Sequence, residues 1–450
     1  MADACQGCKC FIVTTYYKYV LKTCGLPGHT VKRASRILAS GRTCYKNGSP
    51  ANEEIACESE QQTRYRRHFT LGLVQILSWG GSFYLMAVMA NPIAAETGWS
   101  QQWSDGARST GILVSGLLSP LAGRIIARTG GRLLLALSGL VMAVGLVMMA
   151  VSDSLPLFLF AWVIIGIGMA MGLYDALFAT LGTCYGSQAR SAITGITLIS
   201  GFCTTLVWPG TALLIHGFGW RDASLIIAAM MVVCVLPAYL FALPATHAKP
   251  PAKRAVKHSP TPAIEPALFW LLCAIFTLAS VIMTAISVQL IALLQASGHT
   301  LTSALAISAV LGPCQVGSRI VDIVFKRSHP IRTTFFSVGL VALGLLLLAL
   351  FPQMALLSMV LYGAGNGLRA IVRGTLPLAM VKPESYAIVV GKMARPALMG
   401  QALTPLIGGY VFEKMGASAT LWLLCALAIF NVVLVMALKQ RLPAAAVTTA

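Results

Sequence analysis

The sequence predicts an all-α integral membrane protein, with twelve transmembrane helices arranged as two bundles of six. Three observations support this prediction. Of the 450 residues, 57% are hydrophobic and only 10% are charged, whereas soluble domains carry about 25% charged residues. Apolar runs long enough to cross a bilayer recur along the chain. They are interrupted halfway by residues 244–266, which hold six prolines, three lysines and one arginine.

The apolar runs define the expected spans, because a crossing needs about 20 apolar residues for a core of roughly 30 Å. The predicted spans are 69–94, 106–127, 133–151, 157–182, 191–216 and 223–243, then 267–295, 302–325, 333–351, 354–381, 386–412 and 418–438. The proline-rich segment cannot form a continuous helix and is expected to be an extended tether. The predicted domains are an N-terminal extension (1–67) without stable structure, a first bundle (68–243), a basic linker (244–266), a second bundle (267–438) and a tail (439–450).

Lysines and arginines gather at one set of span ends. The predicted inner set is Arg64, Arg66, Arg67, Arg124, Arg128, Arg132, Arg190, Lys326, Arg327, Arg332, Lys382, Lys439 and Arg441, together with the linker. The outer segments hold Arg108, Arg221 and Lys414. Cations are retained in the cytoplasm, so we expect both termini and the linker to be cytoplasmic and the protein to lie in the cell inner (plasma) membrane.

The net charge of +19 would suggest a nucleic-acid ligand in a soluble chain. Here the cations flank apolar spans, so they indicate topology, and we expect the lipid bilayer and a small solute as partners, with no nucleic acid. We also expect a monomer.

The extension contains six of the twelve cysteines, among them Cys5, Cys8 and Cys10. Thiolates at this spacing can bind a soft metal ion. The spacing is not that of a zinc finger, and no second pair completes four ligands. We therefore expect no metal site, and interpret the segment as a disordered leader or as the product of a misassigned start.

A short motif lies between the second and third spans, with Gly123, Arg128, Gly130 and Arg132 around a tight turn. Glycines let helices approach and the chain reverse, and arginines meet anionic headgroups on the inner side. The motif resembles the loop signature of the major facilitator superfamily, G-x-x-x-D-R-x-G-R-R.

The motif departs from the signature at two positions, because Ala127 stands where the family has Asp and Gly131 replaces a base. In the family that Asp takes part in a charged contact between the two halves, so here the contact must be weak or built differently. The corresponding turn of the second half carries a looser echo: Gly312, Pro313, Gly317, Arg319, Asp322, Lys326 and Arg327.

The resemblance implies a secondary transporter in which two bundles expose a midplane site alternately. It implies a small solute, with H⁺ as a coupling ion in a symport mechanism, and no cofactor. The fourth-helix arginine motif and the glycine-proline pattern of drug antiporters are missing, so the chain is more similar to carriers of carboxylates or small anions.

Charged groups inside spans are costly, at about 2.5–3.5 kcal/mol each on insertion scales, so they are rarely without a role. Arg369 lies near the middle of span ten, Arg373 follows one turn later on the same face, and Asn366 precedes them. Arg395, with Lys392, enters span eleven at a similar depth or extends to the interface. Either Arg369, Arg373, Arg395 and Asn366 bind a carboxylate or oxyanion, or they are structural.

Asp175 is the acid deep in a span, and two roles are open to it. It would carry a proton during transport, with its charge disfavoured by burial, or it would be a permanent counter-ion of an arginine. Gln75, Trp79 and Tyr84 of span one and Gln289 of span seven are cavity candidates, although aromatic residues also anchor helices at interfaces.

The sequence contains no GxxxxGK[ST] motif, so it gives no sign of an ATP-binding site that would drive transport. No catalytic triad or metal cluster is recognisable within the spans, which argues against an enzyme. Two further functions remain open: an efflux permease for a toxic small molecule or metalloid, and a transporter-like sensor that binds without transport.

Overall fold

The computed structural model describes residues 66–244, 264–324 and 329–442. Within these ranges every regular element is a helix and no strand occurs. Residues 1–65 of the predicted extension, 245–263 of the linker, Lys326 and Arg327 of the second loop, and 443–450 of the tail lie outside the described residues.

The chain enters the first bundle through a helix over residues 66–80, which turns at 81–85. The named helices of the first half are α4 (Met86–Thr97), α5 (Gln101–Thr129), α6 (Arg132–Ala150), α7 (Leu155–Gly172), α8 (Tyr174–Tyr185), η1 (Gly186–Gln188), α9 (Ala189–Ser200), α10 (Cys203–Met230), η2 (Met231–Val235) and α11 (Leu236–Ala242). Those of the second half are α12 (Pro266–Ala296), α13 (Leu301–Ala309), α14 (Leu311–Val324), α15 (Pro330–Leu350), η3 (Pro352–Met354), α16 (Ala355–Met380) and α17 (Pro383–Arg441).

Nine helices in the described part of the chain are long and apolar enough to cross a membrane. Two of them, Ala189–Ala242 with 54 residues and Pro383–Arg441 with 59, exceed one bilayer by far, since 20 residues already span about 30 Å. Each is broken by a glycine in a left-handed conformation, Gly219 (φ 79°) and Gly416 (φ 79°), where the chain can reverse. Twelve crossings stay a prediction.

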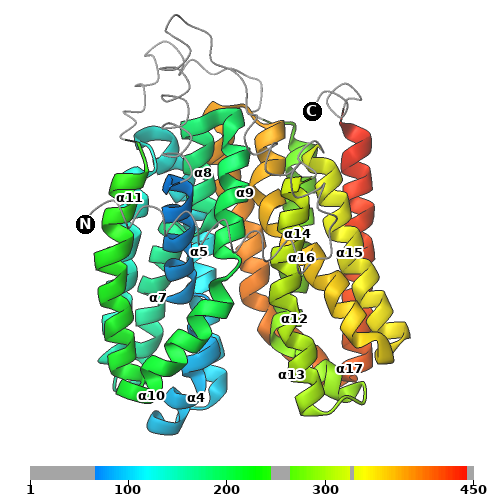
Figure 1. The fold of residues 1–450 in the computed structure, drawn as a ribbon, viewed down its shortest axis with the longest axis horizontal. Helices are drawn as coiled ribbons and strands as arrows, with labels where there is room; N and C mark the ends of the chain where they lie inside the picture. Colours follow the sequence, from blue (N-terminus) through cyan, green and yellow to red (C-terminus); the bar gives the residue numbers. More distant parts are fainter. Residues whose placement is uncertain (1–65, 245–263, 325–328, 443–450) are drawn as a thin grey trace, which may run out of the picture. The chain divides into compact units, whose positions relative to one another are not determined.

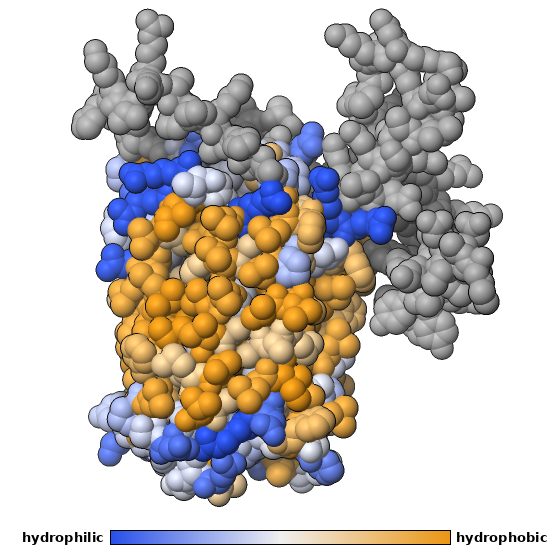
Figure 2. Space-filling view, turned by 90° about the vertical axis from the view of Figure 1, so that its left-hand side faces the viewer, coloured by the Kyte–Doolittle hydropathy of each residue, from blue (hydrophilic) through white to orange (hydrophobic). Residues whose placement is uncertain are grey.

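We call residues 66–244 the N-terminal bundle and residues 264–442 the C-terminal bundle. In Figure 1 the helices α5–α11 lie on one side and α12–α16 on the other. Figure 2 shows a broad apolar band between two hydrophilic rims. Large apolar side chains such as Leu213 (74% exposed) and Phe241 (83% exposed) are exposed on the surface, and a contiguous apolar surface of this extent is typical of contact with lipid.

The two bundles pack most closely where α5 crosses the first part of α17. A Cβ on Gly123 would lie 2.5 Å from the carbonyl oxygen of Ala387, and one on Gly391 would lie 2.6 Å from that of Ser119. The Ser119 hydroxyl also donates to the Gly391 carbonyl at 3.1 Å. Glycine is required here because the backbones touch. This contact lies at the end of the bundles that holds the predicted inner loops.

The loop motif itself has a structural basis in the described residues. Gly130 ends α5 with a φ of 78°, and Gly131 lies against Thr180, whose side chain occupies the place of a Cβ. The Arg132 guanidinium donates to the Leu240 carbonyl within the N-terminal bundle, whereas Arg128 is exposed. Gly123 is thus the motif residue that meets the other bundle.

Arg221 joins three segments at the opposite end of the N-terminal bundle. Its guanidinium contacts Glu96 at 2.8 Å and Asp153 at 3.2 Å, and donates to the Ala150 carbonyl at 2.7 Å. Trp220 donates to the same Glu96 carboxylate at 2.7 Å. These bonds hold the ends of α4, α6 and the sixth predicted span together.

Gly123→Ala is expected to destabilise the protein by about 1–3 kcal/mol, because the added methyl group overpacks a backbone contact. Gly106→Ala on the same helix is the matched control, since no atom lies within 4 Å of its Cβ position and alanine favours a helix over glycine by about 1 kcal/mol. Thermal unfolding in detergent measures both. Equal melting temperatures for the two variants would contradict the close crossing.

Glu96 predicts a pH dependence of stability. Hydrogen bonds from Arg221 lower the pKa of the Glu96 carboxyl below its ordinary value of 4.5. Its contribution is therefore full above about pH 4.5 and is lost as the pH falls through the lowered pKa. We expect Glu96→Gln to lower the melting temperature at pH 7, and the difference from wild type to vanish once the pH has fallen below the lowered pKa of Glu96. Glu413→Gln, at an exposed acid, is the control and should leave the melting temperature unchanged at pH 7 and at acidic pH.

Candidate functional site

A break between α7 and α8 shapes the centre of the N-terminal bundle. Leu173 is extended (φ −80°, ψ −174°), so the Gly172 carbonyl leaves the helical hydrogen-bond pattern. The buried Gln75 amide donates to this carbonyl at 2.8 Å and to the Tyr239 hydroxyl at 2.7 Å, and its oxygen accepts from Trp79 at 3.1 Å. In lipid a freed carbonyl needs such a partner. In this conformation Gln75 supports the break, both of its amide hydrogens are used within the bundle, and its side chain is fully buried.

Asp175 lies in the first turn of α8, directly after the break, where a helix N-terminus favours a negative charge. Its two oxygens accept from Arg373 of α16, at 2.8 Å from Nε and 2.6 Å from Nη2. The two side chains are 17% and 12% exposed. This bidentate ion pair joins the two bundles, and it makes Asp175 the counter-ion of Arg373 in this conformation.

A second break separates α9 from α10 near Gly201, and Arg319 covers it. The Arg319 side chain is 5% exposed, donates to the Thr197 carbonyl of the N-terminal bundle, and donates to Gly367 of α16 at 3.1 Å. Tyr174 and Ser200 share a hydrogen bond of 2.5 Å between the two broken helices. Arg319 thus makes a second polar link between bundles, through backbone carbonyls alone.

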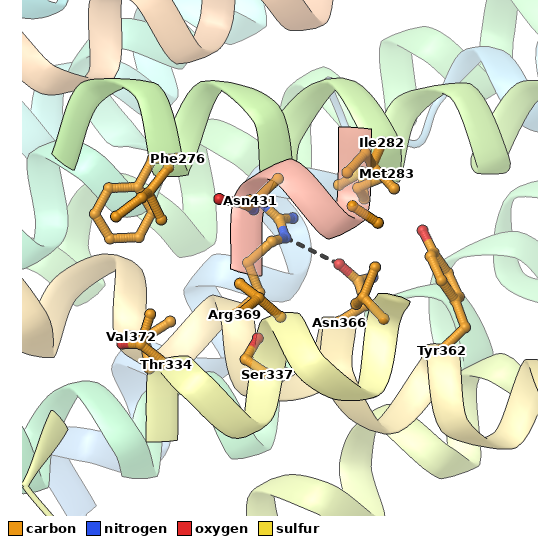
Figure 3. Close-up of a pocket in the computed structure, with 15 residues that line it drawn as sticks. Phe276, Ile282, Met283, Thr334, Ser337, Tyr362, Asn366, Arg369, Val372 and Asn431 are labelled. Carbon is orange, nitrogen blue, oxygen red and sulfur yellow. Dashed lines mark hydrogen bonds between the residues drawn. The ribbon is translucent and has the colours of Figure 1, made fainter. Parts of the chain in front are cut away.

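Arg369 points into a cavity of the C-terminal bundle, lined by α12, α15, α16 and the last part of α17 (Figure 3). Its Nε donates to Asn366 at 2.9 Å. Tyr362, Thr334, Ser337 and Asn431 add polar groups to a wall that is otherwise apolar.

A smaller cavity beside it is lined by Asp175 and Arg373. Phe276 borders both cavities, so they are neighbours. The two predicted arginines therefore have different surroundings. Arg373 is paired with a carboxylate, whereas Arg369 bonds an amide oxygen and borders the larger cavity.

The aromatic cavity candidates form a cluster in the N-terminal bundle. Trp79 lies 5.0 Å from Tyr174 and 5.9 Å from Tyr84 between ring centroids, and Tyr174 stacks on Phe178. Trp79 and Tyr84 are half-buried, and neither lines the cavities of Arg369 and Arg373. Gln289 is buried beside Gly408, and its carbonyl oxygen has no partner among the described residues.

Arg395 is not brought together with the other arginines. It and Lys392 are exposed on α17 and line neither cavity. Asp322, a further acid near the inner end, accepts from Thr333 at 3.0 Å.

Sequence reasoning did not select Arg319, Tyr362 or Asn431 as site residues. Tyr362 could have been found from spacing, because positions 362, 366, 369 and 373 follow one helical stripe. Arg319 was assigned only to the turn of the second half that resembles the loop motif. A lone asparagine in an apolar run, such as Asn431, is a weak indication of a binding site.

A model of the Major Facilitator Superfamily matches residues 71–394. The chain belongs to this superfamily. The match includes the loop motif, both helix breaks and the arginine stripe of α16. A comparison with curated protein sequences gave no match.

Solved structures of the superfamily share the fold. The human organic anion transporter MFSD10 (TETRAN) matches with a TM-score of 0.65 at 14% identity, over 83% of this chain and 99% of that one. The proton:xylose symporter XylE, bound to 6-bromo-6-deoxy-D-glucose, matches with a TM-score of 0.62 at 13% identity, over 85% and 95%. At these identities the likeness concerns the fold.

Membership makes the chain a multi-pass membrane protein and points to secondary transport of a small molecule rather than to enzymatic catalysis. In the superfamily architecture the solute site lies between repeated helix bundles near the midplane.

The ion pair between bundles predicts a thermodynamic coupling. Asp175→Asn and Arg373→Gln should each destabilise the protein by roughly 3–5 kcal/mol, because each leaves one buried group unpaired. The double variant should recover most of this loss, since it removes both charges. Thermal unfolding of the four proteins measures the coupling. Additive losses would show that the two residues do not interact.

Proposed function

We propose that the protein transports a small organic or inorganic anion by alternating access, with Arg369 as the group that binds the anion. The observation that supports this is the pairing of the buried cations. Arg373 is neutralised by Asp175, whereas the two terminal nitrogens of Arg369 have no partner within the described residues. An unpaired guanidinium inside a bundle attracts anions because its charge persists at all physiological pH values.

Charge balance around the two cavities supports an anion over a cation or a sugar. Among the described residues, the bonds of the three arginines Arg319, Arg369 and Arg373 include one carboxylate, that of Asp175. The planar donors of Arg369 suit a carboxylate or oxyanion bidentately. That MFSD10 is an organic anion transporter agrees with this substrate class.

The cycle follows from the contacts between bundles. The crossing at Gly123 and Gly391 closes one end, and opening it requires the Asp175–Arg373 pair and the Arg319–Thr197 bond to separate. A proton can then neutralise Asp175 once Arg373 leaves it, which gives a route to H⁺ symport. In this topology the closed end is cytoplasmic, the site faces outward, and the protein lies in the inner membrane as a monomer.

Proton coupling has its own discriminating experiment. If Asp175 carries the proton, Asp175→Asn abolishes proton-driven uptake but spares solute exchange. If Asp175 is a counter-ion alone, the variant loses both activities.

Arg369→Ala should weaken anion binding about 10- to 100-fold, because it removes charge-assisted hydrogen bonds worth roughly 1.5–3 kcal/mol. A thermal-shift screen of small organic anions identifies ligands, and counterflow in proteoliposomes then measures transport. Arg124→Ala, at an exposed arginine of α5, is the matched control and should behave as wild type.

The same measurements separate the alternative functions. A sensor would bind anions without saturable counterflow, and an efflux permease would move label in the opposite direction. An unchanged anion response in Arg369→Ala would contradict the proposed site. The cysteines Cys5, Cys8 and Cys10, which motivate the metalloid alternative, lie outside the described residues.

A further inference from the structure

The cavity of Arg369 offers more than a positive charge. Tyr362, Asn366 and Arg369 lie at i, i+4 and i+7 of α16 and face it together. Figure 3 shows the Arg369 side chain extending from α16 toward Asn431 of α17, with Tyr362 at the other end of the cavity. A solute bound to Arg369 would therefore meet groups from two helices.

Most of the other polar groups on this wall are already paired. The Ser337 hydroxyl donates to the Gly365 carbonyl at 2.7 Å, and the Thr334 hydroxyl donates to the Pro330 carbonyl at 2.8 Å. Each hydroxyl thus already donates its only hydrogen to a backbone carbonyl. Neither can act as the principal donor to a solute.

Asn431 differs from these two hydroxyls. Its side chain is 2% exposed and borders the cavity, yet its carbonyl oxygen is buried without a donor in the described part of the chain. A buried unpaired acceptor is rare in proteins, and it commonly marks the place of a water or ligand. The Tyr362 hydroxyl, on the same wall, also makes no hydrogen bond with a described residue.

The unpaired groups on this wall thus include cationic donors at Arg369, an acceptor at Asn431 and the Tyr362 hydroxyl. The complementary solute has an anionic group and, close to it, a hydrogen-bond donor. The remaining wall, with Phe276, Ile282 and Val372, is apolar. A sugar would leave most of its hydroxyls unpaired against that wall, whereas a compact hydroxy acid would not.

We propose that the transported anion is a 2-hydroxycarboxylate, whose carboxylate pairs with Arg369 and whose hydroxyl donates to the Asn431 carbonyl oxygen. This assignment rests on the proposed function and deepens it. Asn431 then determines specificity, because a carboxylate without the hydroxyl leaves its oxygen buried and unpaired. A site built around such a bond rejects the analogue that lacks the donor.

Three pairs of probes differ by one hydroxyl group: glycolate and acetate, malate and succinate, mandelate and phenylacetate. Calorimetric titration of the full-length protein gives dissociation constants, and inhibition of counterflow in proteoliposomes gives an independent ranking. In at least one pair the hydroxylated member is expected to bind about 5- to 100-fold more tightly. Equal affinity within every pair, combined with loss of binding in Arg369→Ala, overturns this inference and leaves the proposed function intact.

Asn431→Leu, or Asn431→Ala if the first variant does not fold, tests the residue. It should abolish the difference within the pair while retaining the affinity for the member without the hydroxyl. A difference that persists in the variant overturns the role of Asn431. Absence of binding by any small anion to the wild-type protein overturns the proposed function as well.

Discussion

A guanidinium group stays protonated and charged inside a membrane, because its pKa lies far above physiological pH. Each buried arginine must therefore find oxygen atoms. Arg373 has the Asp175 carboxylate, Arg319 has two backbone carbonyls, and Arg369 has the Asn366 oxygen and a cavity. The centre of the molecule is organised around these oxygens. At Arg369 the described residues provide a partner for Nε alone, and the terminal nitrogens lie at a cavity.

The break between α7 and α8 positions one of these partners, because Asp175 lies in the first turn of α8. An unbroken helix uses its own carbonyls, so it offers few acceptors to a neighbour. The break before Asp175 frees the Gly172 carbonyl for Gln75 and Tyr239. The Thr197 carbonyl, in contrast, keeps its helical bond from the Gly201 N–H at 3.0 Å while it also accepts from Arg319. At this break, side chains from other helices thus restore the hydrogen bonds of the freed carbonyl.

The sequence was sufficient for the apolar helices and for the arginine stripe, because both depend on local periodicity. The family match and the helical structure confirm the fold class. The Asp175–Arg373 pair depends on residues 198 positions apart, so spacing could not select this partner among three arginines. Arg395 had the same apparent depth as Arg373 in the sequence but is exposed, because depth does not determine which face of a helix turns inward.

Ala127 poses the question of how the bundles are held without the carboxylate usual in the loop motif. In the structure two separate contacts hold the bundles together. Gly123 retains the steric part, since its backbone touches α17, and the charged part lies deeper, at Asp175 and Arg373. A carboxylate exposed in a loop interacts weakly through water, whereas a shielded pair interacts strongly but is costly to separate. The charged contact of this chain therefore lies between α8 and α16, so any motion that parts the two bundles there has to separate a strongly interacting pair.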